Sequence, residues 1–161
     1  MIGDRITREE MYLMMAHDCA KRSTCIRGNT GCVIVDVYDT VVSTGYNGAA
    51  RGHEDCQERG YCWRNENNIK SGEHYERCYA IHAEQNALIQ SGKASRGATM
   101  YMTTIGQNGD VECKLPCLLC SRLIVNANIY EILIATDNEY NYKLFSPEYV
   151  YNYRHEEVGM W

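Results

Sequence analysis

The sequence predicts a three-layer α/β/α fold with a mixed central sheet of about five strands. Two β-prone runs follow a first predicted helix, and predicted helices and strands alternate after them. The helical stretches carry apolar residues on one face, which can pack on a sheet. A chain of 161 residues corresponds to about one domain, and we predict a single domain over residues 1–161.

The first helix is expected from about residue 8 to 22. Thr7-Arg8-Glu9-Glu10 has the pattern of a capping box, in which the first and fourth side chains bond to each other's backbone N–H. Met11, Met15 and Cys19 then recur at helical spacing. This face is expected to pack on the sheet.

An antiparallel hairpin is expected next. Residues 32–35 and 41–44 are β-prone runs, and the turn between them contains Asp39. Residues 47–78 hold glycines, asparagines and charges with little periodicity, which predicts a long functional loop.

The second half of the chain alternates helices and strands. Apolar residues from Ile81 to Ile89 predict a helix that ends near Gly92, and residues 98–103 and 129–135 predict two strands. Pro116 suits the first turn of a helix between those strands. A last helix can follow Pro147.

Composition limits the possible partners and compartment. The formal net charge is −5, which argues against a broad basic face for nucleic-acid backbone. No apolar run approaches the roughly 18 residues of a membrane span, and residues 1–5 lack secretory character. Nine cysteines without an export signal indicate a reducing compartment. We therefore expect a cytoplasmic protein with neither a membrane nor a nucleic-acid partner.

Two short motifs predict a catalytic metal site. His82-Ala83-Glu84 is followed by Pro116-Cys117-Leu118-Leu119-Cys120, and together they resemble the signature of zinc-dependent nucleobase deaminases. Cys117 and Cys120 can both reach one ion from a helix start, and His82 can supply the third ligand. This Cys₂His set leaves a fourth position open for water, as in catalytic zinc sites.

Glu84 is the predicted catalytic acid/base. It stands two residues after His82, so it can face the water, take its proton and pass that proton to a ring nitrogen. The alternative is a purely structural zinc knuckle in a non-catalytic interaction module, for which a missing fourth protein ligand would be unusual.

Four stretches resemble the deoxycytidylate (dCMP) deaminase family of the cytidine deaminase superfamily, including its phage and bacterial members. They are Ser23-Thr24-Cys25-x-Arg27, Gly31-Cys32-Val33-Ile34-Val35, Gly45-Tyr46-Asn47-Gly48 and His82-Ala83-Glu84-Gln85-Asn86-Ala87. The resemblance implies a cytidine-deaminase-like fold and zinc-dependent conversion of dCMP to dUMP and ammonia, which feeds thymidylate synthesis. It also implies a homo-oligomer, usually a hexamer, in the host cytoplasm if the origin is a phage.

The same resemblance implies allosteric control. The family is activated by dCTP and inhibited by dTTP, each bound with Mg²⁺ around the loop that corresponds to Gly45, Tyr46, Asn47 and Gly48. The two glycines also permit close backbone approach, and a simple turn is the alternative. Cys32 and Ala50 depart from the family pattern, where alanine and proline are common, and this puts the effector preferences in doubt.

Substrate contacts are expected at four positions. Asn47 is the candidate for a sugar hydroxyl, Ser23 and Arg27 are candidates for the phosphate, and Asp137 matches a family position near the substrate. A solvated surface charge is the alternative for Arg27, and a helix C-terminal residue is the alternative for Ser23.

A second, structural zinc is expected to order the long loop. Some family members carry such a site, and the matching residues here are Cys25, Cys56, His74 and Cys78. Buried free cysteines are the alternative. For the activity, the alternatives are a bifunctional dCMP/dCTP deaminase and a tRNA adenosine-type deaminase.

Overall fold

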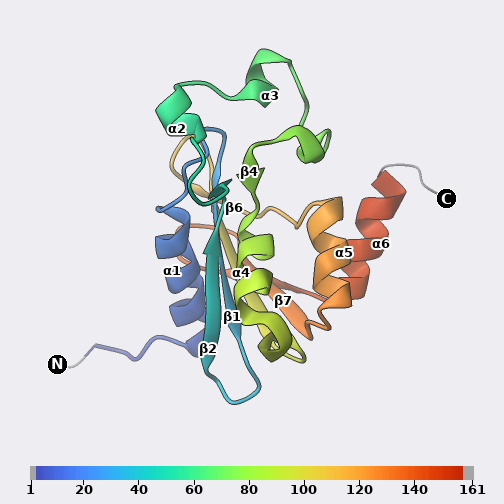
Figure 1. The fold of residues 1–161 in the computed structure, drawn as a ribbon. Coiled ribbons are helices and arrows are strands. Elements are labelled where there is room, and N and C mark those ends of the chain that lie inside the picture. Colours follow the sequence, from blue (N-terminus) through green and yellow to red (C-terminus); the bar gives the residue numbers. More distant parts are fainter. Residues whose placement is uncertain (1–2, 158–161) are drawn as a thin grey trace.

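The computed structural model describes residues 3–157 (Figure 1). The helices are α1 (Arg8–Ala20), α2 (Cys56–Arg59), α3 (Trp63–Glu66), α4 (Ala83–Ser91), α5 (Leu118–Asn126) and α6 (Pro147–Glu157), with 3₁₀ turns η1 (Tyr75–Arg77) and η2 (Gly92–Ser95). The strands are β1 (Asn29–Val35), β2 (Val41–Tyr46), β3 (Gly48–Ala49), β4 (Ala80–Ile81), β5 (Thr99–Ile105), β6 (Val111–Glu112), β7 (Glu131–Ala135) and β8 (Tyr142–Phe145).

The central sheet is mixed, as predicted. Its strand order is β2-β1-β5-β7-β8, and the short β6 pairs with β5. Only the β5–β7 pair is parallel among the pairings described, and α5 forms the crossover between these two strands.

Helices cover both faces of the sheet (Figure 1). One core contains Tyr12, Leu13 and Ala16 of α1, and the other contains residues of α4, α5 and α6. Both cores draw on alternate residues of the same strands, because successive side chains point to opposite faces of a sheet. The predicted three-layer α/β/α fold is therefore confirmed. The single-domain prediction for residues 1–161 stays a prediction, and residues 1–2 and 158–161 lie outside the described residues.

Two glycines allow the helices to approach the hairpin closely. A Cβ at Gly31 would lie 1.8 Å from the carbonyl oxygen of Ala16 in α1. A Cβ at Gly45 would lie 2.2 Å from the carbonyl oxygen of Ala83 in α4. These distances are far below van der Waals contact, so only glycine fits at either position in this arrangement.

The predicted first helix, hairpin, second helix and last helix are all present, and the main differences are at element ends. The first helix ends at Ala20 rather than near residue 22. Pro116 does not lie in the first turn of α5, because Cys117 is the N-cap and the helix begins at Leu118. Strands β6 and β8 were not predicted, because they are short and lack a clear apolar alternation.

The long loop over residues 47–78 contains more local structure than predicted. It carries β3, α2, α3 and η1, and its ends are joined where β3 pairs with β4. The segment lies beyond one end of the central sheet (Figure 1). Arginine–aromatic contacts replace an apolar core there: Arg59 lies over Tyr79, Arg64 over Tyr75 and Arg77 over Trp63. Such contacts have no sequence period, which explains why the pattern indicated only a loop.

Among residues 3–157, no helix is both long and apolar enough to cross a bilayer.

Candidate metal centre and active site

His82, Cys117 and Cys120 meet at one point, although they come from separate elements. His82 Nδ1 lies 3.4 Å from Sγ of Cys117 and 3.4 Å from Sγ of Cys120. A tetrahedral zinc with ordinary Zn–N and Zn–S bond lengths would hold such atoms roughly 3.6 Å apart. The donor set and its spacing therefore fit zinc, and the predicted ligand set is brought together.

His82 is positioned by the start of α4. It is the N-cap residue, its backbone N–H donates to Gln85 Oε1, and its carbonyl accepts from Asn86 N. The helix is in turn tied to β2, because Asn86 Nδ2 donates to the Tyr46 carbonyl and Ser43 Oγ donates to the Ala87 carbonyl. The close packing at Gly45 thus sets where His82 lies.

The two cysteines lie at the start of α5. Cys117 is the N-cap and Cys120 is in the first turn, where free N–H groups and the helix dipole favour thiolates. A hydrogen bond from Cys120, and the neighbouring His82, lower the pKa of Cys117 to about 4. The same hydrogen bond and burial raise the pKa of Cys120 well above its usual value, because the pair shares one proton. A bound cation would displace that proton.

Glu84 is buried beside these ligands and is not one of them. Its side chain is only 4% exposed and belongs to the first turn of α4. Burial raises the pKa of this carboxyl, which favours a group that both accepts and returns a proton. The arrangement has the parts of a metal-assisted hydrolytic site.

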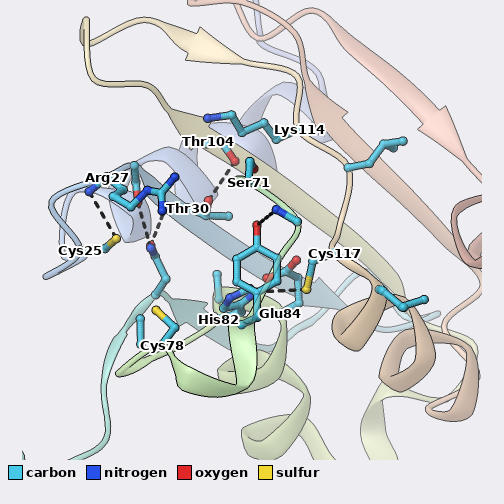
Figure 2. A pocket seen from close by; sticks show the side chains of 18 of the residues that line it. Cys25, Arg27, Thr30, Ser71, Cys78, His82, Glu84, Thr104, Lys114 and Cys117 are labelled. Carbon is cyan, nitrogen blue, oxygen red and sulfur yellow. Dashed lines mark hydrogen bonds between the residues drawn. The ribbon is translucent and has the colours of Figure 1, made fainter. Parts of the chain in front are cut away.

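A cavity of about 1090 Å³ opens over this centre. Figure 2 places His82, Glu84 and Cys117 together in it, with Arg27 and Thr30 to one side and Lys114 near Thr104. The volume is sufficient for a nucleotide-sized ligand. Four basic side chains line the cavity, which favours a ligand with an anionic group: Arg27, Arg64, Lys114 and Arg154.

Two predicted substrate contacts line this cavity. Arg27 donates through one Nη to the Ile69 carbonyl at 3.2 Å, which leaves other guanidinium donors for a ligand. Asn47 is more fully engaged: Oδ1 accepts from Thr30 N, and Nδ2 donates to the Gly28 carbonyl. Asn47 therefore also joins the end of β2 to the start of β1.

The other two predicted contacts do not line the cavity. Ser23 is buried, and its Oγ accepts from Cys25 N at the turn after α1. Asp137 lies in the β7–β8 connection, where its carboxylate accepts from the backbone N–H groups of Glu139 and Asn141. Both side chains have clear local structural roles.

The proposed effector loop lies between β2 and the long segment. Gly45 and Tyr46 end β2, and Gly48 begins β3 and pairs with Ile81, next to His82. Gly45 lies against the backbone of α4, so its lack of a side chain is needed for packing within the protein. Tyr46 is partly exposed.

The predicted ligands of the second zinc are not gathered to bonding distance. Cys25, Cys56 and Cys78 line the cavity together with Cys62, whereas His74 is exposed. His74 Nδ1 instead lies 3.2 Å from Glu76 Oε1. Among residues 3–157, only His82, Cys117 and Cys120 form a group whose ligand atoms all lie within 4.8 Å of one another.

The cysteines of the long segment nevertheless influence one another. Burial, followed by the proximity of Cys25, Cys62 and Cys78, raises the pKa of Cys56 to about 11. All nine cysteines lie within the described residues and all are free thiols. The sequence places Cys62 in the same loop as these cysteines, but the ligand set predicted from it contained His74 instead.

Sequence reasoning also missed three side chains of the cavity wall. Tyr75, Arg64 and Lys114 all line it. Lys114 could have been found from its place just before Leu115-Pro116-Cys117, whereas Arg64 and Tyr75 lie in a segment without periodicity. Arg64 is 4% exposed and donates to the Lys70 and Glu73 carbonyls.

The family model described as the cytidine and deoxycytidylate deaminase zinc-binding region matches residues 6–136. A deoxycytidylate deaminase of Schizosaccharomyces pombe is 35% identical over 129 residues, which cover 80% of this chain and 37% of that protein. The deoxycytidylate deaminase of Mycobacterium phage D29 is 34% identical over 131 residues, which cover 78% of this chain and 91% of that protein. The chain spans only about a third of the two yeast relatives, 37% in S. pombe and 36% in Saccharomyces cerevisiae.

Solved structures share the fold. The cyanophage S-TIM5 dCMP deaminase in apo form aligns with a TM-score of 0.57 at 23% identity, over 80% of this chain and 82% of that chain. Its complex with dCMP and dUMP aligns with a TM-score of 0.57 at 22% identity, over 83% and 85%. Cytidine deaminase from Mycobacterium leprae aligns with a TM-score of 0.51 at 14% identity, over 90% and 98%.

Proposed function

The chain belongs to the cytidine and deoxycytidylate deaminase family, and from this premise we propose that it converts dCMP and water to dUMP and ammonia. The observation that carries the proposal is the buried Glu84 carboxylate beside the three-ligand set of His82, Cys117 and Cys120. A structural zinc would use a fourth protein ligand, and a carboxylate left off the metal would have no purpose.

Three side chains would hold the zinc. His82 supplies Nδ1, and Cys117 and Cys120 supply thiolates from the start of α5. Zinc bound to them supplies Lewis acidity, which makes water a nucleophile near neutral pH. The protein holds all three donors on elements packed against the sheet, so little reorganisation is needed.

Glu84 transfers the protons of the reaction. Its carboxylate takes a proton from the attacking water and delivers it to N3 of the cytosine ring as oxygen adds to C4. It then transfers the second proton of that water to the departing amino group. The C4–N bond breaks, ammonia leaves, and C4 keeps a carbonyl. Burial excludes bulk water from the carboxylate and favours its protonated state midway through this cycle.

A monophosphate substrate is supported by the cavity and by the relatives. Arg27 and Lys114 provide positive charge on the cavity wall, and Lys114 is paired with Glu112, 2.6 Å away. Relatives named deoxycytidylate deaminase align over about four-fifths of the chain, and the S-TIM5 enzyme was solved with dCMP and dUMP. We propose that Arg27 binds the phosphate and Asn47 the sugar hydroxyl, whereas the contacts predicted for Ser23 and Asp137, which do not line the cavity, stay predictions from the sequence.

We also propose regulation and assembly of the kind that the family resemblance implies. Activation by dCTP and inhibition by dTTP, each with Mg²⁺, would act at Gly45, Tyr46, Asn47 and Gly48 in a homohexamer. The support is positional, since this loop joins β2 to β3 and lies next to Ile81 and His82 through the β3–β4 pair. The product would supply thymidylate synthesis.

A second, structural zinc remains part of the proposal, with one revised ligand. We propose Cys25, Cys56, Cys62 and Cys78. Cys62 replaces His74 because His74 is exposed and paired with Glu76, whereas Cys62 is buried and close enough to influence Cys56. Backbone N–H groups also approach two of the sulfurs: Arg27 N donates to Cys25 Sγ, and Ala80 N to Cys78. Such bonds stabilise thiolates.

The test is ultraviolet-monitored deamination of dCMP by the zinc-loaded protein, with cytidine, dCTP and a tRNA as comparison substrates. Turnover of dCMP alone, with activation by dCTP and inhibition by dTTP, is the expected result. Turnover of both dCMP and dCTP would indicate a bifunctional enzyme. Deamination of adenosine in tRNA would show that the substrate is tRNA and not dCMP. Inactivity on all of them with bound zinc would indicate a non-catalytic zinc module.

A further inference from the structure

Arg154 of the last helix holds the backbone that leads into the metal-binding helix. Its Nε donates to the carbonyl of Pro116 at 2.7 Å, and one Nη donates to the carbonyl of Leu115 at 2.8 Å. The other Nη is paired with Glu157. Each guanidinium nitrogen therefore already has a partner within the protein.

These two carbonyls immediately precede a metal ligand. Cys117 directly follows Pro116 and is the N-cap of α5, where no side-chain hydrogen bond caps the helix. The proline ring restricts φ at Pro116, so the remaining freedom of this junction is mainly rotation about ψ at Leu115 and Pro116. Hydrogen bonds to both carbonyls restrict these rotations, and with them the direction in which the Cys117 side chain leaves the backbone.

The helix that supplies Arg154 lies outside the part of the chain that resembles the family. The family match ends at residue 136, and α6 covers residues 147–157. Val150 of α6 belongs to the same core as Cys120 and Ile124 of α5, so the two helices are packed together. The geometry of the metal centre thus includes a contribution from beyond the matched region.

We propose that Arg154 is a positioning residue of the metal centre, which holds Cys117 in the orientation that binds zinc. This inference rests on the proposed function only for the identity of the metal. Arg154 also lines the cavity, so a direct contact with substrate phosphate is the rival role. The bonds from one guanidinium to two consecutive carbonyls favour the positioning role, whereas the two N–H donors that remain on Arg154 are the ones that a phosphate would have to use.

The test compares Arg154→Met, Arg154→Lys and Glu157→Gln. Zinc affinity is measured without nucleotide, by competition with a chromophoric chelator, and thermal unfolding of the metal-free proteins is measured alongside. Arg154→Met should weaken zinc binding by about 10- to 100-fold, the usual effect of losing a group that orients a metal ligand. Arg154→Lys, which can restore one carbonyl contact, should fall between. Glu157→Gln is the matched control and should bind zinc as the wild type does.

Kinetics at saturating zinc separate the rival roles. Positioning predicts a lower kcat in Arg154→Met with a KM for dCMP within about twofold of the wild type. Unchanged zinc affinity would overturn the inference, and a large rise in KM with unchanged affinity would assign Arg154 to substrate binding. If Arg154→Met does not fold, Arg154→Lys decides the question. Because the affinity measurement needs no substrate, the inference can hold even if dCMP proves not to be the substrate.

Discussion

The ring of Tyr75 meets the ring of His82 edge-on, with 4.8 Å between the centroids and 86° between the planes. The guanidinium of Arg64 lies 4.2 Å from the centroid of the same tyrosine. A buried cation and a metal ligand therefore both contact Tyr75, which joins the long segment to the catalytic centre.

Tyr75→Ala should impair the reaction without removing the metal ligands. Aromatic pairs of this kind contribute about 0.5–1.5 kcal/mol, which corresponds to a loss of roughly 2- to 12-fold in kcat/KM. Tyr75→Phe is the matched control, because it keeps the ring and loses only the hydrogen bond from Gly72 N. Steady-state kinetics on dCMP check this, and equal losses in both variants would assign the effect to the hydroxyl.

Glu84→Gln should retain zinc and lose turnover. The amide keeps the size of the side chain but cannot take up and return a proton, so kcat should fall by at least about 10²- to 10⁴-fold. Zinc content by elemental analysis should match that of the wild type. A Glu84→Gln protein with near-normal turnover would rule out the proposed mechanism.

Gly45→Ala should destabilise the protein through α4. The added Cβ would lie 2.2 Å from Ala83 O and 2.6 Å from Ala87 N, so the helix has to move away from β2. Overpacking of this kind costs about 1–3 kcal/mol in the free energy of unfolding, and zinc affinity should fall because His82 begins that helix. Chemical denaturation measures the cost. Gly3→Ala, where nothing lies within 4 Å, is the control and should have no effect.

Asp137→Asn should reveal a pH-dependent contribution to stability. Hydrogen bonds, first from the Asn141 side chain and then from backbone N–H groups, hold the pKa of Asp137 below its usual 3.8. A lowered folded-state pKa means that the stabilisation is present above the unfolded value and is lost as pH falls through the folded value. The metal-free variant should therefore melt below the wild type at pH 7 and approach it near pH 3. If Asp137 also contacts substrate, as the sequence predicts, the KM of the Asp137→Asn variant for dCMP will rise as well.

Cys62→Ser and His74→Ala together test the revised structural zinc. Loss of a thiolate ligand should reduce bound zinc from about two equivalents per chain to about one, while His74→Ala should leave it unchanged. Elemental analysis after dialysis measures both. Loss of an equivalent in His74→Ala, with full zinc content in Cys62→Ser, would restore the original ligand set.

The sequence alone predicted the two halves of the proposed metal centre and the main elements. His82 and Glu84, like Cys117 and Cys120, are close in sequence and lie at helix starts, so local spacing is enough to predict their shared direction. The first helix and the hairpin follow from apolar periodicity and turn residues for the same reason.

Only the tertiary structure decided which distant side chains support that centre. Arg154 reaches Pro116 from a helix beyond the family match, Arg64 and Tyr75 meet across an irregular segment, and Cys62 lies near Cys56 while His74 turns to Glu76. Arginine makes hydrogen bonds and ring contacts at the end of a long flexible side chain, so its partners depend on packing rather than on spacing. That is the physical reason why the sequence predicts the chemistry of this site but not the contacts that hold it in place.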